Sequence, residues 1–157
     1  MAEQRPENSF ATTPASSELY VEALLQAARD NDDAAAETLL GAGVNPTVGD
    51  GQQRTPIWYA GNHNSATVAT LLLRDDRVIS TINAPDATKG ASPLLAAADT
   101  DSVDVAKMFL ANGANVNFVT PKGITPLIRA AMQGNRAVTT VLLQAGADCS
   151  MHTQKGK

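Results

Sequence analysis

The chain of 157 residues is poor in cysteine, in aromatic residues and in positive charge. The lone cysteine, Cys149, excludes an internal disulfide and predicts a reducing compartment. Aromatic residues make up 4% of the chain, which is too few to favour a β-sandwich. The net charge of −4 indicates no basic surface of the kind that nucleic acid or an anionic membrane requires. We therefore expect no nucleic-acid partner.

Long apolar segments are also missing. No apolar run approaches the roughly 18 residues that a membrane-spanning helix needs. The first residues carry Glu3 and Glu7 and have no apolar stretch, so they do not resemble a signal peptide. These features predict a cytoplasmic protein that does not insert into a membrane.

The residues that are abundant favour a compact helical domain. Apolar residues make up 43% of the chain and charged residues 18%, which is typical of a globular protein. Alanine is frequent, and together with leucine and glutamate it suits short, closely packed helices. Composition alone therefore predicts an all-α fold.

A repeat runs through most of the sequence. The segments 55–61, 92–98 and 125–131 each begin with Thr-Pro or Ser-Pro and continue with apolar and small residues. Leu-Leu or Phe-Leu pairs follow downstream, and their second members lie 33, 37 and 33 residues apart. These second members are Leu40, Leu73, Leu110 and Leu143. A fixed period of this length predicts a stack of similar structural units.

A second column of the repeat predicts where helices end. Asn31, Asn64, Asp101 and Gly134 have the same spacing as the leucine pairs. Asparagine, aspartate and glycine are the residues that best tolerate a left-handed backbone. One requirement explains the whole column: a helix ends there in a turn with positive φ.

Each unit then consists of two helices and a loop. The hydroxyl residue caps the first helix and the proline occupies its first turn. A pair of small residues, such as Ala60-Gly61, allows this helix to approach its neighbours closely. The second helix ends before a glycine, as at Gly113, and a loop leads to the next unit. The step of 37 residues predicts four extra residues between Arg74 and Ala91, in a connecting loop.

These motifs resemble the ankyrin repeat, which has a period near 33 and a Thr-Pro-Leu-His-x-Ala core. The resemblance implies an all-α, ankyrin-type helix-turn-helix repeat solenoid with extended or β-hairpin connections. About four repeats are predicted, at approximately 17–49, 50–86, 87–119 and 120–150, after a disordered tail at 1–16. Residues 151–157 would begin a fifth repeat.

The sequence departs from the ankyrin pattern at several positions. Trp58, Leu95 and Ile128 replace the histidine of the motif, which predicts the loss of a hydrogen bond near the helix start. Gln53 stands where other units have glycine, so we expect the tip of that loop to differ in shape. The aromatic pair Trp58 and Tyr59 has two possible interpretations. The two rings form an exposed recognition pair, or they pack between units.

No residue pattern indicates catalysis or metal binding. Cys149 and His152 supply two potential ligands, whereas a zinc site usually needs four. The other histidine, His63, is distant in the sequence, and no nucleophile, base and orienting group come together. We expect no cofactor, no metal and no enzyme activity.

The resemblance implies that the protein binds another protein through its loop tips and concave helical face. Mixed polarity along this surface predicts a polar partner with an apolar anchor near Met132. The predicted partner-binding residues are Arg29, Asp30, Gln52, Arg54, Asn62, His63, Lys89, Asp99, Thr100, Lys122, Met132 and Gln133.

Three further expectations concern the chain as a whole. We expect a monomer that can self-associate if the apolar face around Val138, Val141 and Leu142 lacks a covering repeat. A second hypothesis makes the chain the N-terminal targeting array of a larger enzyme or channel. A third makes it a substrate for modification, because Asn45, Asn83 and Asn117 resemble asparagines that are hydroxylated in some ankyrin proteins.

Overall fold

The computed structural model describes residues 14–150, and their side chains from Ser17 onward. Over this range the backbone forms helices, turns and loops, and no strand. The helices are α1 (Pro14–Asp30), α2 (Asp33–Gly41), α3 (Pro56–Asn62), α4 (Ala66–Leu72), α5 (Asp76–Ser80), α6 (Pro93–Asp99), α7 (Val103–Ala111), α8 (Pro126–Gln133) and α9 (Arg136–Gln144).

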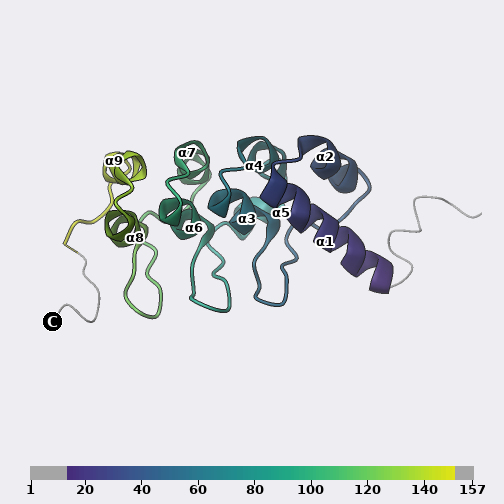
Figure 1. Ribbon diagram of the computed structural model, residues 1–157, viewed down its shortest axis with the longest axis horizontal. Helices are drawn as coiled ribbons and strands as arrows, with labels where there is room; N and C mark the ends of the chain where they lie inside the picture. The colour runs from purple at the N-terminus through teal and green to yellow at the C-terminus, as the bar shows by residue number, and fades with distance from the viewer. Residues whose placement is uncertain (1–13, 151–157) are drawn as a thin grey trace, which may run out of the picture.

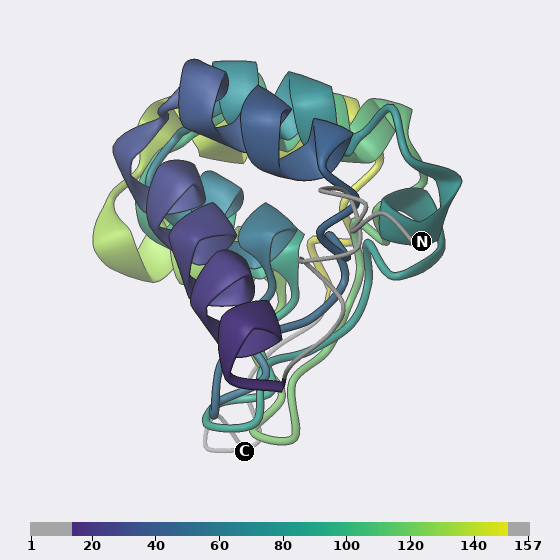
Figure 2. The same ribbon diagram turned by 90° about the vertical axis from the view of Figure 1, so that its right-hand side faces the viewer.

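The helices form two parallel rows with loops projecting from one side (Figure 1). The inner row holds α1, α3, α6 and α8, and the outer row holds α2, α4, α7 and α9. Within the inner row α3 packs against both α1 and α6, and α6 packs against α8. Figure 2 shows the array from its end, with the loops below the inner row. The predicted helical repeat solenoid is confirmed.

The Thr-Pro and Ser-Pro segments open the inner helices as predicted. The hydroxyl oxygens of Thr55, Ser92 and Thr125 accept hydrogen bonds from the backbone N–H three residues later, at 3.3, 3.3 and 3.1 Å. The following proline occupies the first turn of α3, α6 and α8. Its fixed φ suits that position, and its missing N–H has no helical partner to lose.

The left-handed column is confirmed at all four positions. The φ angles of Asn31, Asn64, Asp101 and Gly134 are 55°, 54°, 56° and 74°. In each unit the next residue donates its N–H to a carbonyl oxygen in the preceding inner helix, at 2.9 to 3.0 Å. This bond closes the helix end and turns the chain back into the outer row.

Two residues of this column also cap a helix in the next unit, which the sequence analysis did not predict. Asn31 Oδ1 accepts hydrogen bonds from the Thr67 hydroxyl at 2.8 Å and from Val68 N at 3.3 Å. Asp101 Oδ1 accepts from Val138 N at 3.0 Å. The N-cap residues of α4 and α9 make no side-chain cap of their own. One unit therefore supplies a hydrogen-bond acceptor for a free backbone N–H in the first turn of its neighbour's outer helix.

This cap can be measured against a matched position. We expect Asp101→Gly to lower the free energy of unfolding by about 1 kcal/mol more than Asn64→Gly does. Both changes give glycine a left-handed position that it adopts easily, but among the described residues the Asn64 side chain caps nothing. Urea unfolding of both variants gives the difference. Equal effects on stability would show that the Asp101 cap contributes nothing.

The leucine pairs are buried unequally. Leu72, Phe109 and Leu142, the first members of three pairs, are all 0% exposed, whereas the second member Leu143 is 45% exposed. These three first members belong to the hydrophobic core, as stacked units require. The expectation that the face around Val138, Val141 and Leu142 lacks cover is wrong, because packing of α9 against α7 and α8 buries all three.

The extra residues after the second unit are not simply loop. Three of the four extra residues lie before Asp86. In this stretch the chain forms the short helix α5, whose Val78 is fully buried. The fourth lies in the next loop, where Asp86 N bonds to Ala91 O across one residue more than in the equivalent loops. A buried apolar side chain makes this insertion part of the packed structure.

The first inner helix is longer than the others. α1 spans 17 residues, whereas α3 and α6 span 7 each. It begins at Pro14 rather than near Ser17, so the predicted tail boundary at residue 16 falls inside a helix. The rest of the predicted tail, residues 1–13, and the predicted start of a fifth repeat at 151–157 lie outside the described residues.

Candidate functional site

Three hairpin-like loops, here called fingers, precede α3, α6 and α8 (Figure 1). The first residue of each finger, Asp50, Asp86 or Thr120, uses a side-chain oxygen to accept backbone N–H groups from the far side of its loop, at 2.7 to 3.1 Å. The same residues donate their own N–H across the finger. These bonds satisfy the loop backbone without forming a strand.

The left-handed position near the tip is kept in all three fingers. Gln53, Gly90 and Gly123 have φ angles of 59°, 68° and 77°. The expectation that the Gln53 tip differs in shape is therefore wrong, and Gln53 adopts a backbone that suits glycine better. Neighbouring tips also pack: a Cβ atom at Gly90 would lie 2.6 Å from Cδ of Pro121.

An ion pair joins the second finger to the first. Arg54 Nε lies 3.4 Å from Asp86 Oδ2, and Arg54 Nη2 lies 3.1 Å from the Thr88 hydroxyl. The Asp86 side chain is 1% exposed and accepts further hydrogen bonds from Thr88 and from Ala91 N. Burial by itself would raise the pKa of Asp86, but these hydrogen bonds and Arg54 lower it.

Trp58 and Tyr59 are packed between units. They are 8% and 7% exposed, so the interpretation as an exposed recognition pair is wrong. Arg29 lies 4.2 Å from the Tyr59 ring centroid and Arg54 lies 4.7 Å from that of Trp58, which gives one cation–π contact on each side. Trp58 Nε1 donates to Ala91 O at 3.0 Å, so a hydrogen bond is kept where its loss was predicted.

Tyr59 also anchors the base of the first finger. Its hydroxyl lies 2.5 Å from Asp50 Oδ2. Burial would raise the pKa of Asp50, but the hydrogen bonds from Tyr59 and from the backbone of Arg54 and Gln52 lower it. The Arg29 guanidinium bonds to Glu22 and to Gln26, both at 3.0 Å. This side of the array is thus a connected network rather than a set of free groups.

A groove of about 480 Å³ lies between the second and third fingers and the inner helices; we call it the finger groove. Trp58, Leu95 and Ala96 contribute apolar side chains to its lining, and all three are buried. Its charged lining residues are Arg54, Asp86, Lys89, Asp99, Lys122 and Arg129. The groove therefore combines an apolar floor with charged walls, as ligand-binding surfaces commonly do.

The family model for ankyrin repeats in three copies matches the chain twice, at residues 24–118 and 79–153. Together these matches cover most of the sequence. The chain belongs to the ankyrin repeat family. No curated protein matches it in sequence. Ankyrin repeats are generally protein-interaction modules, and the family is typically not enzymatic.

The finger groove brings together five of the predicted partner-binding residues of this ankyrin array. Lys89 and Lys122 are exposed at neighbouring finger tips. Asp99 accepts a hydrogen bond from Gln133 at 2.8 Å and lies 3.6 Å from Arg129 Nε. Those in the groove are Arg54, Asn62, Lys89, Asp99 and Lys122.

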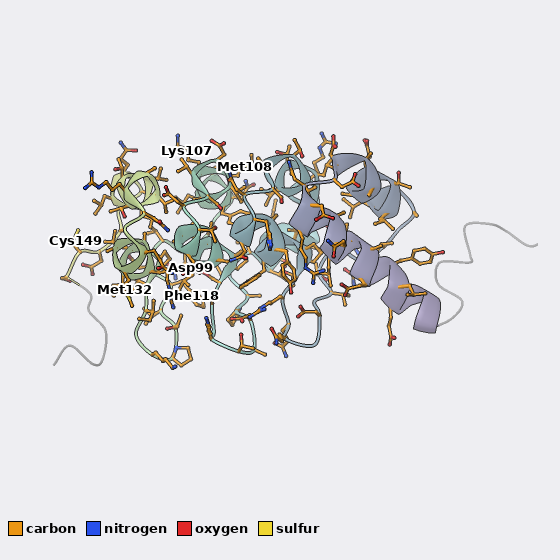
Figure 3. The ribbon with its side chains drawn as sticks, in the orientation of Figure 1. Asp99, Lys107, Met108, Phe118, Met132 and Cys149 are labelled. Carbon is orange, nitrogen blue, oxygen red and sulfur yellow. The ribbon has the colours of Figure 1, made fainter. Side chains whose placement is uncertain are left out.

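The other predicted residues lie outside the groove. Met132 is 63% exposed near the end of α8, on the surface of the last unit (Figure 3). Thr100 bonds to Ser102 and to its own helix. Asp30 accepts from Gln26, and the His63 ring contacts its own helix at Tyr59 O. Those outside the groove are Arg29, Asp30, Gln52, His63, Thr100, Met132 and Gln133.

Sequence reasoning missed two residues of the groove, Asp86 and Arg129. Arg129 occupies the repeat position that holds Tyr59 and Ala96 in other units, so its column does not indicate a charged site. Asp86 has the same role as Asp50, but it lies six residues before its Ser-Pro whereas Asp50 lies five before its Thr-Pro, so the extra residue in its finger takes it out of the column.

Other site types find little support among residues 14–150. This part of the chain contains no cluster of three or more potential metal-ligating side chains. Within it no helix is both long enough and apolar enough to cross a bilayer. His152, one of the two weak ligand candidates, lies outside the described residues.

The three asparagines noted as candidates for modification occupy two different structural positions. Asn83 accepts from Asn115 N at 2.7 Å, and Asn117 accepts from Asp148 N at 2.8 Å, so each ties its loop to the next unit. Asn45 instead bonds within its own turn, to Thr47 N at 3.0 Å. Hydroxylation remains a prediction, and only Asn83 and Asn117 are equivalent to each other.

Proposed function

We propose that this array is a scaffold or adaptor domain that binds a protein partner through the fingers and the concave face beside them. The supporting observation is a division between repeated and varying side chains. The apolar residues that begin the leucine pairs of the last three units, Leu72, Phe109 and Leu142, are buried in stacking. The exposed residues at the ends of the inner helices differ between units, as at Asp30, His63, Thr100 and Gln133. Variation on a rigid scaffold is what partner recognition requires.

Residues outside the stacking network allow a clean test. Lys89, Lys122 and Met132 are exposed, and their side chains make no hydrogen bond or ion pair with any residue that the structure describes. Changing them to alanine should therefore leave the fold intact. Glu37, Lys107 and Arg136 on the outer helices are equally exposed and provide a control. Figure 3 shows Lys107 on the outer row, away from Met132 and Asp99.

We expect the triple variant K89A/K122A/M132A to lose captured partner proteins, and the control E37A/K107A/R136A to retain them. A loss of at least about fivefold is expected, since three central contacts of about 0.5 kcal/mol or more each exceed that ratio. Quantitative affinity capture with mass spectrometry, using both variants and the original chain, measures it. Retention by the first variant and loss by the second would place the binding surface on the outer helices instead.

A further inference from the structure

The charges of the finger groove do not balance. Its lining contains four basic residues and two acidic ones, although the chain as a whole carries a net charge of −4. Both carboxylates are already engaged: Asp86 with Arg54 at 3.4 Å, and Asp99 with Arg129 at 3.6 Å. The ammonium groups that remain belong to Lys89 and Lys122.

These two lysines occupy equivalent places on neighbouring fingers. Each directly precedes the left-handed glycine of its tip, Gly90 or Gly123. Packed helices lie about 10 Å apart, and the units that carry the lysines are neighbours in such a stack. An extended peptide rises about 3.3 Å per residue. Residues about three apart on an extended ligand could therefore meet the two ammonium groups together.

The floor between the fingers suits apolar side chains. Trp58 is 8% exposed and Leu95 3%, so each presents a small apolar area to the groove. Ile124, half-buried, adds an aliphatic edge beside Lys122. A ligand that fits this surface needs anionic groups at the level of the tips and apolar groups closer to the helices.

We propose that the finger groove binds an extended acidic peptide segment of the partner, with aspartate or glutamate carboxylates paired to Lys89 and Lys122 and apolar side chains on the floor. This inference rests on the proposed function and specifies its ligand. A nucleic acid fits less well, because two unpaired ammonium groups on a chain of net negative charge give little attraction for a phosphate backbone.

The first unit carries the opposite charge and limits where such a segment can lie. A second groove, of about 630 Å³, runs between α1 and the first finger. Its lining includes the carboxylates of Glu18, Glu22 and Asp50, of which Glu22 is paired with Arg29, and no basic residue among those described. An acidic segment is repelled there and attracted to the later fingers, so the array orients its ligand along the stack.

The test uses random dodecapeptides displayed on phage and selected on the full chain, on K89E/K122E and on K107E. We expect peptides selected by the original chain to be enriched at least about twofold in aspartate and glutamate over the unselected library. K107E, a single lysine-to-glutamate change on an outer helix, should preserve this enrichment. K89E/K122E should abolish it or replace it with lysine and arginine. A synthetic peptide from the selection should bind the double variant about tenfold more weakly.

The outcomes separate this inference from the function on which it rests. Peptides without acidic enrichment, whose binding is lost in M132A and kept in K89E/K122E, would overturn the acidic ligand and leave the protein-binding function standing. Failure both to select peptides and to capture any partner through the fingers would reject both. Single-stranded DNA that binds more tightly than the selected peptides, with the same dependence on the lysines, would also overturn the proposal.

Discussion

Replacing Asp86 by alanine is expected to lower the free energy of unfolding by about 3 kcal/mol. The carboxylate is almost fully buried and serves Arg54, Thr88 and the backbone N–H of Ala91. Removing it leaves a half-buried guanidinium and a buried N–H without their acceptor, and breaking such a pair costs far more than breaking a surface pair. Denaturant unfolding measures the loss. Glu37→Ala on the exposed face of α2 is the control and should change stability little.

The same residue should govern part of the response to acid. The pKa of Asp86 is lowered in the folded protein, so its carboxylate stabilises the fold fully above the unfolded pKa of about 4. That contribution disappears as the pH falls from about 4 toward the folded pKa. Asp86→Asn should therefore be less stable at neutral pH and lose less stability on acidification. Parallel slopes of stability against pH in the two proteins would contradict this role.

Replacing Gly61 by alanine is expected to destabilise the array by about 1 to 3 kcal/mol, although alanine normally stabilises a helix by about 1 kcal/mol relative to glycine. A Cβ atom at Gly61 would lie 2.7 Å from Pro93 O and 2.9 Å from Phe109 Cε2. The first neighbour is backbone and the second is a fully buried ring, so neither yields easily. Gly41, in α2, has nothing within 4 Å of its Cβ position and provides the control. Gly41→Ala should be neutral or stabilising.

Gly61 and Phe109 depart from the repeat together. Other units place alanine at the Gly61 position, as at Ala98, and leucine at the Phe109 position, as at Leu142. The larger ring therefore occupies space that the missing methyl group leaves open. We expect G61A/F109L to recover at least about 1 kcal/mol relative to the sum of the two single changes. Additive effects in this double-mutant cycle would show that the two positions are independent.

The period and the capping chemistry were readable from the sequence because they are local. A hydroxyl residue before proline caps a helix wherever it occurs, and Asn31, Asn64 and Asp101 were expected to be left-handed because few other residues accept that backbone. The stack of two-helix units followed from repetition of these signals. These inferences needed no knowledge of which units touch.

The composition of the groove was harder to foresee because it depends on contacts between units. Arg54 was expected to meet a partner, yet it bonds to Asp86, 32 residues away, and stacks on Trp58. Asp99 was predicted to bind a partner, and Arg129 and Gln133 of the next unit engage it. Such pairings arise only when neighbouring units lie side by side, and the displaced spacing around α5 hid the first of them.

What the sequence determined by itself was therefore the architecture: repeated caps, turns and apolar columns specify each unit through interactions within a few residues. Only the tertiary structure decided which groove charges remain available, because stacking pairs Arg54 with Asp86 and Asp99 with Arg129 and leaves Lys89 and Lys122 exposed at the tips. A side chain's local pattern shows which element it belongs to. Its neighbours in the next unit determine whether its charge is already neutralised.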